Sequence, residues 1–161
     1  MQNTEKTYVL GIDIGSTTVK IAILDSNHDV VFSDYRRHYA NIQGTLAAQL
    51  SDAFEKIGEV NIIPMITGSG GLTLSKHLKS TFVQEVVAVA TALKAVAPQT
   101  DVAIELGGED AKIIYFTGGI DQRMNGICAG GTGSFIDQMA SLLQTDAIGL
   151  NEYAKSYKSI Y

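Results

Sequence analysis

Two short segments of this chain, 92 residues apart, share one pattern of strand, acid, glycine turn and strand. Ile12–Ile21 aligns with Ile104–Ile113, and four of the ten aligned positions are identical. In each segment an apolar run contains one acidic residue close to its end, Asp13 in the first and Glu105 in the second. A glycine turn and a further strand pattern follow in both. Such a duplication predicts two related units rather than one uniform domain.

The hydrophobic patterns predict an α/β protein, because strands and helices alternate along the chain. A break near Pro98 separates a first lobe, residues 1–98, from residues 99–161, which we expect to be part of a second, duplicated lobe. The expected strands are Tyr8–Ile14, Thr17–Leu24, Asp29–Tyr39, Val60–Ile66, Asp101–Leu106, Lys112–Phe116 and Ile120–Met124. The expected helices end at Ile57, Val96, Leu143 and Tyr157, and their predicted core positions include Leu46, Leu50, Ala53, Phe54, Ile57, Met139 and Leu142.

Composition excludes several classes of protein. The formal net charge is −5, and Lys and Arg form no cluster beyond Arg36 and Arg37, so we expect no nucleic-acid binding. The sequence has neither a signal-peptide pattern nor a membrane-length apolar run, so we expect no membrane association. Cys128 is the single cysteine, which favours a reducing compartment such as the cytoplasm. The histidines lack ligand spacing and are interpreted as surface residues: His28, His38 and His77.

The first glycine turn has the composition of an anion site. The residues that can present N–H or hydroxyl groups to phosphate oxygens are Gly15, Ser16, Thr17 and Thr18, and Lys20 can add a positive charge if it faces the same way. Asp13, at the strand end, is a candidate ligand for hydrated Mg²⁺. The alternative is an ordinary hairpin with polar turn residues.

The second glycine turn carries three acids. Its candidate phosphate-binding residues are Gly107, Gly108 and Glu109, and its acids are Glu105, Glu109 and Asp110. Three carboxylates would repel a phosphate bound beside them. A Mg²⁺ ion held by Glu105 between the carboxylates and the phosphate is the simplest way for both to be present. The alternative is a solvated acidic turn, and we assign Asp110 to that role. Neither a P-loop pattern nor a dinucleotide-binding fingerprint is present.

A third glycine-rich segment precedes the predicted helix that contains Phe135. Gly131 and Thr132 lie where backbone N–H groups at a helix N-terminus favour anions. Cys128 in this segment is a candidate metal ligand, or alternatively a small buried hydrophobic residue. A fourth turn, Gly68–Gly71, either lies near the same site or is a simple connector.

With these motifs in order, the chain resembles the 2-hydroxyacyl-CoA dehydratase activators, the BadF/BadG/BcrA/BcrD family of ATPases. The motifs are Asp13-x-Gly15-Ser16-Thr17-Thr18-x-Lys20, then Glu105 to Asp110, then Asn125 to Gly133 with its cysteine. The family lies within the superfamily of acetate kinase, sugar kinases and actin. The resemblance implies a ribonuclease H-like, actin-like ATPase lobe of βββαβα order, with the start of a second copy.

The resemblance also implies cofactors, partners and residue roles. It implies a homodimer bridged by one 4Fe–4S cluster, with ATP hydrolysis coupled to one-electron transfer to a CoA-ester dehydratase or reductase. Residues 15–20, 107–109, 131 and 132 would contact the phosphates of ATP or ADP. Asp13 and Glu105 would act in catalysis by holding Mg²⁺ and the attacking water, and Cys128 would bind the cluster.

The sequence departs from the family pattern in three respects. Glu105 stands where the family usually has Asp, and neither a second cluster cysteine nor the adenine-binding glycine motif is present. We therefore expect an N-terminal fragment that is inactive as an enzyme. Two other functions stay open, a small-molecule kinase of the same superfamily, such as a sugar or acetate kinase, and a non-catalytic nucleotide-binding module.

Overall fold

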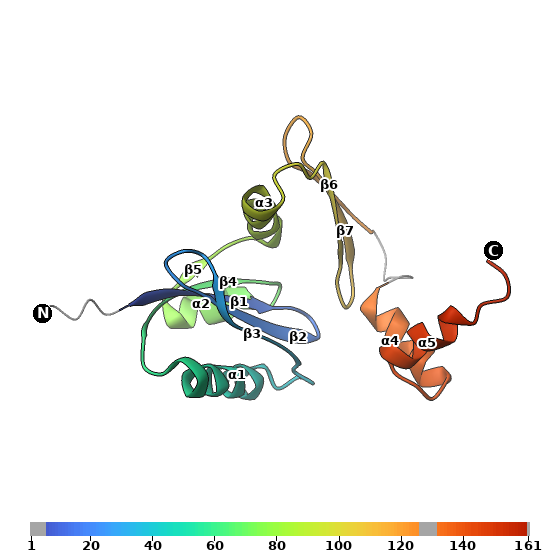
Figure 1. The fold of residues 1–161 in the computed structure, drawn as a ribbon, viewed down its shortest axis with the longest axis horizontal. Coiled ribbons are helices and arrows are strands. Elements are labelled where there is room, and N and C mark those ends of the chain that lie inside the picture. The colour runs from blue at the N-terminus through green and yellow to red at the C-terminus, as the bar shows by residue number, and fades with distance from the viewer. Residues whose placement is uncertain (1–5, 126–131, 161) are drawn as a thin grey trace, which may run out of the picture. The chain divides into compact units, whose positions relative to one another are not determined.

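The computed structural model describes residues 6–125 and 132–160, which divide into two compact units at Pro98 and Gln99 (Figure 1). The first unit contains β1 (Thr7–Ile14), β2 (Thr18–Leu24), β3 (Val30–Arg37), α1 (Ile42–Ile57), β4 (Asn61–Thr67), α2 (Gly71–Leu78), β5 (Thr81–Phe82) and α3 (Glu85–Val96). The second contains β6 (Val102–Leu106), β7 (Ala111–Tyr115), β8 (Asp121–Met124), α4 (Gly133–Leu142) and α5 (Ala147–Lys155).

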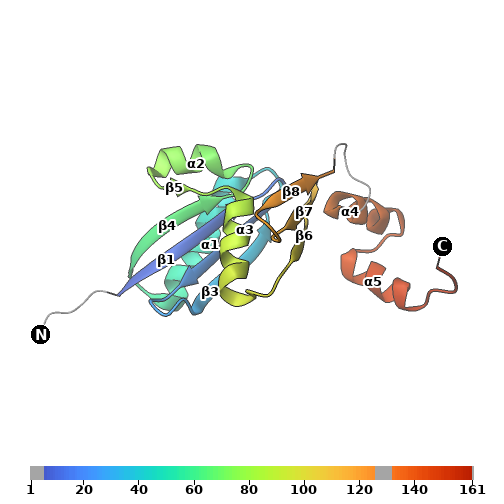
Figure 2. The ribbon, with the colours of Figure 1, turned by 90° about the horizontal axis from the view of Figure 1, so that it is seen from above.

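The first unit is built on a five-stranded mixed sheet in the order β3-β2-β1-β4-β5 (Figure 2). β1, β2 and β3 form an antiparallel meander, whereas β4 runs parallel to both β1 and β5. The parallel pairing of β1 with β4 requires a crossover, and α1 lies in the segment that supplies it. The α/β class predicted from the sequence is thereby confirmed.

One face of this sheet forms the hydrophobic core. Alternate residues of β1 and β2 lie opposite one another, so that Ile12 faces Ile21 and Ile14 faces Val19. Because side chains in a strand alternate between faces, this register puts the buried aliphatic side chains of both strands on the same face. Helix α1 covers that face, and the buried core residues are Leu10, Ile12, Ile14, Val19, Ile21, Ile23, Phe32, Leu46, Ala53 and Ile66.

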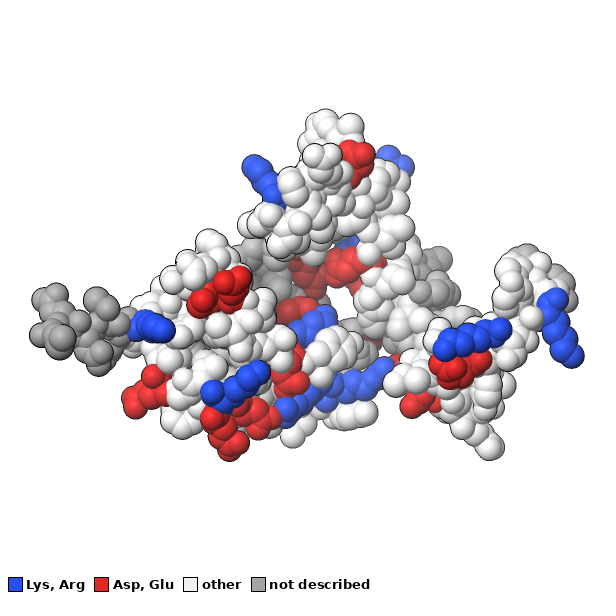
Figure 3. Space-filling model, viewed as in Figure 1, with Lys and Arg blue, Asp and Glu red and all other residues white. Residues whose placement is uncertain are grey.

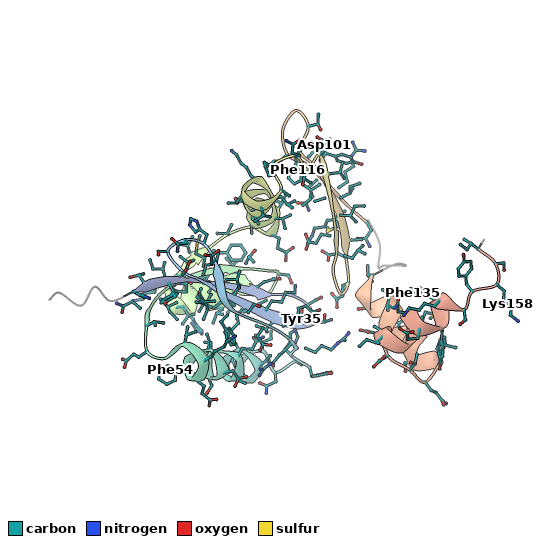
Figure 4. All side chains as sticks on the ribbon, viewed as in Figure 1. Tyr35, Phe54, Asp101, Phe116, Phe135 and Lys158 are labelled. Atoms are coloured by element: carbon teal, nitrogen blue, oxygen red, sulfur yellow. The ribbon has the colours of Figure 1, made fainter. Side chains whose placement is uncertain are left out.

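Helix α1 differs in one position from the predicted apolar face. Leu46 and Ala53 are buried as expected, but Phe54 is 60% exposed and points away from the sheet (Figure 4). A polar residue, Gln49, is fully buried instead, and its Nε2 donates a hydrogen bond to the carbonyl of Val19 at 3.0 Å. The helix is therefore rotated so that one amide side chain, rather than a phenyl ring, faces β2.

The Arg36 side chain connects β3 to α1. Its guanidinium forms ion pairs with Asp34, at 2.7 Å, and with Asp52 of α1. The hydrogen bond to Asp52 raises the pKa of Arg36 above its ordinary value. Figure 3 shows acidic and basic side chains intermingled over this unit. One of the two adjacent arginines is therefore already paired with carboxylates.

The second unit contains a three-stranded antiparallel sheet in the order β6-β7-β8. Ile114 of β7 and Ala140 of α4 are its buried hydrophobic residues among those described. The expectation that Leu142 belongs to the core is wrong, because its side chain is 74% exposed at the last residue of α4. No helix in the described parts of the chain combines the length and apolarity needed to cross a bilayer.

Two isoleucines on β4 test the assignment of the core face. Ile66 is fully buried, whereas Ile63, on the opposite face of the same strand, is 55% exposed. We expect Ile66→Ala to lower the free energy of unfolding by about 2–5 kcal/mol, because it leaves a cavity in the core. Ile63→Ala should cost about 1 kcal/mol or less. Urea unfolding followed by circular dichroism measures both, and equal losses would contradict the assigned face.

Candidate functional site

The first hairpin places an acid beside a lysine at the end of the sheet. β1 ends at Ile14 and β2 begins at Thr18, and the N–H of Gly15 donates to the Thr18 carbonyl at 2.9 Å. A Cβ at Gly15 would lie 3.5 Å from Thr18, an ordinary contact. The geometry of the turn would therefore tolerate a side chain at residue 15. A glycine is required at this position only if a ligand approaches the backbone closely.

The second hairpin repeats the first. The N–H of Gly107 donates to the carbonyl of Asp110 at 2.8 Å, as Gly15 does to the residue three positions later. Glu105 lies opposite Lys112 in the β6–β7 register, as Asp13 lies opposite Lys20 in the first hairpin. The two aligned ten-residue segments, 12–21 and 104–113, therefore have the same strand register and the same hydrogen bond across the turn.

In both hairpins the lysine forms an ion pair with the acid opposite it. Lys20 Nζ lies 2.7 Å from Asp13 Oδ2, and Lys112 Nζ lies 3.3 Å from Glu105 Oε1. Lys112 also forms an ion pair with Asp110 at 3.2 Å. The expectation that Asp110 is only solvated is therefore wrong. Each lysine thus neutralises a carboxylate of its own hairpin, and this sets the charge that an incoming anion would meet.

Lys20 has a second neighbour on β3. Its Nζ lies 5.7 Å from the centroid of the Tyr35 ring, and Tyr35 is the residue directly opposite it in the register. Figure 4 shows Tyr35 at the edge of the first unit. Asp13, Lys20 and Tyr35 therefore form a row across three strands, which holds the ammonium group between a carboxylate and an aromatic face.

The start of helix α4 contacts the second hairpin. The N–H groups of Gly133 and Ser134 donate to the carbonyls of Gly107 and Gly108 at 2.9 and 2.8 Å. Thr132 is fully buried beside them, whereas Gly131 and Cys128 lie outside the described residues. Two of the helix N-terminal donors are thus used within the protein, so an anion at this end would bind other N–H groups.

The Gly68–Gly71 turn lies against the first hairpin and is more than a connector. The N–H of Gly70 donates to the Ile14 carbonyl at 2.9 Å, and Gly68 has φ of 92°. A Cβ on Gly68 would lie 2.5 Å from Asp13 Oδ1 and closer still to the Ile14 carbonyl oxygen. Only a glycine permits this approach.

The interpretation of His38 as a surface residue is wrong. Its side chain is buried, with 8% of the residue exposed, and its Nε2 lies 3.3 Å from the carbonyl oxygen of Gly15. The sequence contains a signal for this, because residues 32, 34, 36 and 38 share one face of β3 and of the chain that continues it. Phe32 fixes that face as the buried one.

The acids of both hairpins suit a hydrated Mg²⁺ ion, which binds one or two carboxylates and keeps several waters. Glu105 Oε1 is held by Lys112, while its Oε2 is buried without a hydrogen-bond partner. Thr67 Oγ1, whose residue lies opposite Asp13 in the β1–β4 register, is likewise buried without one. The described residues contain no cluster of three or more acidic, histidine or cysteine ligands, so no site made of protein ligands alone is indicated there.

A pair of glycine substitutions tests the contact between the Gly68 turn and Asp13. Gly58 has a similar φ of 78°, but a Cβ added there would meet nothing within 4 Å. Gly58→Ala should therefore cost about 1 kcal/mol from backbone strain alone. Gly68→Ala should cost at least about 2 kcal/mol more, because the methyl group also displaces Asp13 and Ile14. Urea unfolding measures both variants, and equal costs would exclude the close approach.

Comparison with known proteins identifies a family and a fold for this chain. The model of the BadF/BadG/BcrA/BcrD ATPase family matches residues 10–155. The activator of lactoyl-CoA dehydratase from Anaerotignum propionicum is 35% identical over 144 residues, which cover 86% of this chain and 54% of that protein. This chain spans between half and two thirds of the length of the curated relatives it matches.

Two solved activator structures share the fold. The Acidaminococcus fermentans (R)-2-hydroxyglutaryl-CoA dehydratase component A has a TM-score of 0.82 at 29% identity, covering 96% of this chain and 61% of that one. The activator of the 2-hydroxyisocaproyl-CoA dehydratase from Clostridium difficile, with bound ADPNP, has a TM-score of 0.81 at 27% identity, covering 96% and 59%. The fold is thus that of an actin-like ATPase, and the chain belongs to the BadF/BadG/BcrA/BcrD ATPase family.

Proposed function

We propose that this chain is the nucleotide-binding part of an activator that couples ATP hydrolysis to one-electron transfer to a CoA-ester dehydratase or related reductase. The observation that carries the ATPase part is the duplicated hairpin, in which an acid, a lysine and a glycine turn occupy matching positions of two sheets. Membership of an ATPase family and likeness to an activator structure with bound ADPNP support it.

In this proposal the turns of the hairpins bind the phosphates. The first turn offers hydroxyl and N–H donors from Ser16, Thr17 and Thr18, and the second offers N–H groups of Gly108 and Glu109. Gly15 and Gly107 let the phosphates approach the backbone closely. Thr132 and Gly131 would add contacts from the segment before α4.

Asp13 and Glu105 would hold the metal ion and orient the attacking water. A bound Mg²⁺ ion supplies neutralising charge to the phosphates. Lys20 and Lys112 each hold one oxygen of these carboxylates, Asp13 Oδ2 and Glu105 Oε1, in a fixed position. An incoming phosphate also gives each lysine a second anion, and the ion pairs are expected to loosen as it binds.

The redox part of the proposal rests on Cys128 and on the family. A 4Fe–4S cluster is held by four thiolates, and such a cluster supplies a one-electron carrier. Two copies of Cys128, one from each subunit of a homodimer, supply two of them, so two further thiolates must come from other residues. We place this chemistry in the cytoplasm, because a reducing compartment keeps a lone cysteine reduced and so available as a cluster ligand.

An isosteric substitution tests the role of Asp13. Asp13→Asn in the full-length protein should lower the rate of Mg-ATP hydrolysis by about 100-fold or more, since it removes charge from the catalytic centre while preserving side-chain volume. Asp29→Asn, on the exposed turn before β3, is the matched control and should leave the rate unchanged. A phosphate-release assay measures both, and an unaffected Asp13 variant would refute the assignment.

The affinity of this chain alone gives a second test. We expect isothermal titration at micromolar concentrations of Mg-ATP to show weak or undetectable binding, with binding measurable only at millimolar concentrations. The chain supplies residues for the phosphates and none matched to the adenine motif. Titration with inorganic pyrophosphate serves as the comparison and should give a similar affinity. A submicromolar dissociation constant for Mg-ATP would show that the chain holds a complete site.

Metal analysis tests the redox part separately from the ATPase part. We expect anaerobically purified full-length protein to contain iron and acid-labile sulfide, and Cys128→Ala to lose both. Ser16→Ala should keep its iron while binding ATP less well, because its hydroxyl belongs to the phosphate turn. Absence of iron from the unmodified protein, or retention of iron by Cys128→Ala, would refute the redox role.

A further inference from the structure

His38 follows β3 and contacts the turn of the first hairpin through two groups. Its backbone N–H donates to the carbonyl of Thr17 at 3.1 Å, and its Nε2 lies 3.3 Å from the carbonyl oxygen of Gly15. The residue is buried, so these contacts are shielded from water. A single residue therefore holds two of the carbonyl groups in the turn that carries the candidate phosphate donors.

The hydrogen bonds around the ring fix its tautomer. The N–H of Ala40 donates to Nδ1 at 3.1 Å, and an atom that accepts a hydrogen bond in this way carries no proton. The carbonyl oxygen of Gly15 can only accept, so Nε2 must carry the proton that it donates. The neutral ring protonated on Nε2 is thus the form that satisfies both partners.

The same ring holds an unusual stretch of backbone. Tyr39 and Ala40 have φ of 44° and 64°, a left-handed conformation that is uncommon for residues other than glycine. The segment continues into α1, because the N–H of Asn41 donates to the His38 carbonyl and its side chain caps the helix at Gly44. His38 therefore links the hairpin turn to the start of α1 through a constrained connection.

We propose that His38 is a positioning residue that sets the direction in which the first turn presents its N–H groups to phosphate. In a trans peptide the carbonyl of one residue and the N–H of the next point in opposite directions. Holding the Gly15 and Thr17 carbonyls against His38 therefore directs the N–H groups of Ser16 and Thr18 away from it. This inference rests on the proposed function, since the anion in question is the phosphate of ATP.

In the second hairpin the turn carbonyls are also held by hydrogen bonds, but from different groups. Gly107, which matches Gly15 in the duplication, has its carbonyl held by the N–H of Gly133 at 2.9 Å. The next carbonyl, that of Gly108, is held by Ser134. Two hairpins of different sequence thus both have their turn carbonyls restrained from outside the hairpin. In the first of them the restraint depends on a side chain, and a substitution can remove it.

The tautomer can be observed directly in this chain. Nitrogen-15 imidazole spectra at neutral pH should show one histidine as the neutral form protonated on Nε2, and His38→Gln should remove that signal. The exposed His28 and His77 are internal references for a solvated ring. A His38 ring protonated on Nδ1, or on both nitrogens, would overturn the proposal, because the contacts with Gly15 and Ala40 could not then coexist.

Two substitutions separate the two ring contacts. His38→Gln keeps a donor near the Nε2 position and so can still reach Gly15. His38→Asn keeps an acceptor near the Nδ1 position for Ala40 but is too short to reach Gly15. We expect the Ser16, Thr17 and Thr18 amide signals to shift in His38→Asn only, because only this variant releases the Gly15 carbonyl and lets the turn change direction.

A titration with Mg-ATP at millimolar concentrations, followed at the same amides, connects the turn to the ligand. His38→Asn should weaken binding by roughly tenfold, and His38→Gln should stay within about threefold of the unmodified chain. Unchanged β4 amide signals in both variants show that the unit containing His38 is folded. Equal affinity of His38→Asn and the unmodified chain would overturn the positioning role.

The readouts distinguish the failure of this inference from the failure of the proposed function. If Mg-ATP leaves the turn amides of the unmodified chain unchanged, the phosphate assignment is wrong. The tautomer, and the amide shifts that separate His38→Asn from His38→Gln, still report whether His38 holds the turn. If instead Mg-ATP shifts those amides equally in all three proteins, the assignment stands and the positioning role is refuted.

Discussion

The structure depends on the register between β1 and β2. Side chains alternate between the two faces of a strand, so one register decides at once which residues are buried and which face the other side. With Ile12 opposite Ile21, the aliphatic residues of both strands form the core under α1, and Asp13 and Lys20 come together on the other face. A shift of one residue would bury the charged pair and expose the isoleucines. The hydrophobic effect therefore holds the candidate site in position, although none of the site's own charges contributes to the core.

The acid and lysine pairs indicate how carboxylates could be tolerated at the proposed site for an anion. A carboxylate alone repels phosphate, and a lysine alone would attract it without directing it. In the first hairpin, pairing the two across neighbouring strands leaves little net charge and fixes the position of each group. In the second, Lys112 fixes the positions of both Glu105 and Asp110 and neutralises only one of them. The pair of Lys20 and Asp13 is partly exposed, so its contribution to the stability of the fold is small. Lys112 is buried, so removing its acidic partners would leave a buried charge without compensation. Their value lies in orientation, since each acid keeps a defined direction relative to the turn beside it.

Most of the fold was predictable from the sequence, because alternation in strands and glycines at turns report local structure. The duplicated hairpins, the strand β4 and the helix α1 follow from such patterns. Helix α2 had no predicted bounds, because its buried positions are Gly71 and Ser75 rather than a hydrophobic stripe. Phe54 and Gln49 exchanged the roles expected from hydrophobicity, because a buried amide that reaches the Val19 carbonyl satisfies a backbone group that a phenyl ring cannot. The burial of His38 is indicated in the sequence only by its alternation with Phe32 along β3, because the Gly15 carbonyl that its ring contacts lies 23 residues away in the chain.

The two hairpins have the same backbone but differ in the chemistry of their turns. The first carries Ser16, Thr17 and Thr18, which supply hydroxyl donors and no charge, so its one acid and one lysine balance. The second carries Glu109 and Asp110 in addition to Glu105, against a single Lys112, and is therefore acidic. A turn rich in donors favours phosphate oxygens, whereas an acidic turn favours a cation or a water made nucleophilic by a base. The two hairpins therefore share their backbone pairing but offer different groups, hydroxyl donors in the first and mainly carboxylates in the second. Apart from two pairs of isoleucines and the pair Lys20 and Lys112, the aligned segments are identical only at Gly15 and Gly107. Each of these glycines closes its turn, because its N–H donates to the carbonyl three residues later.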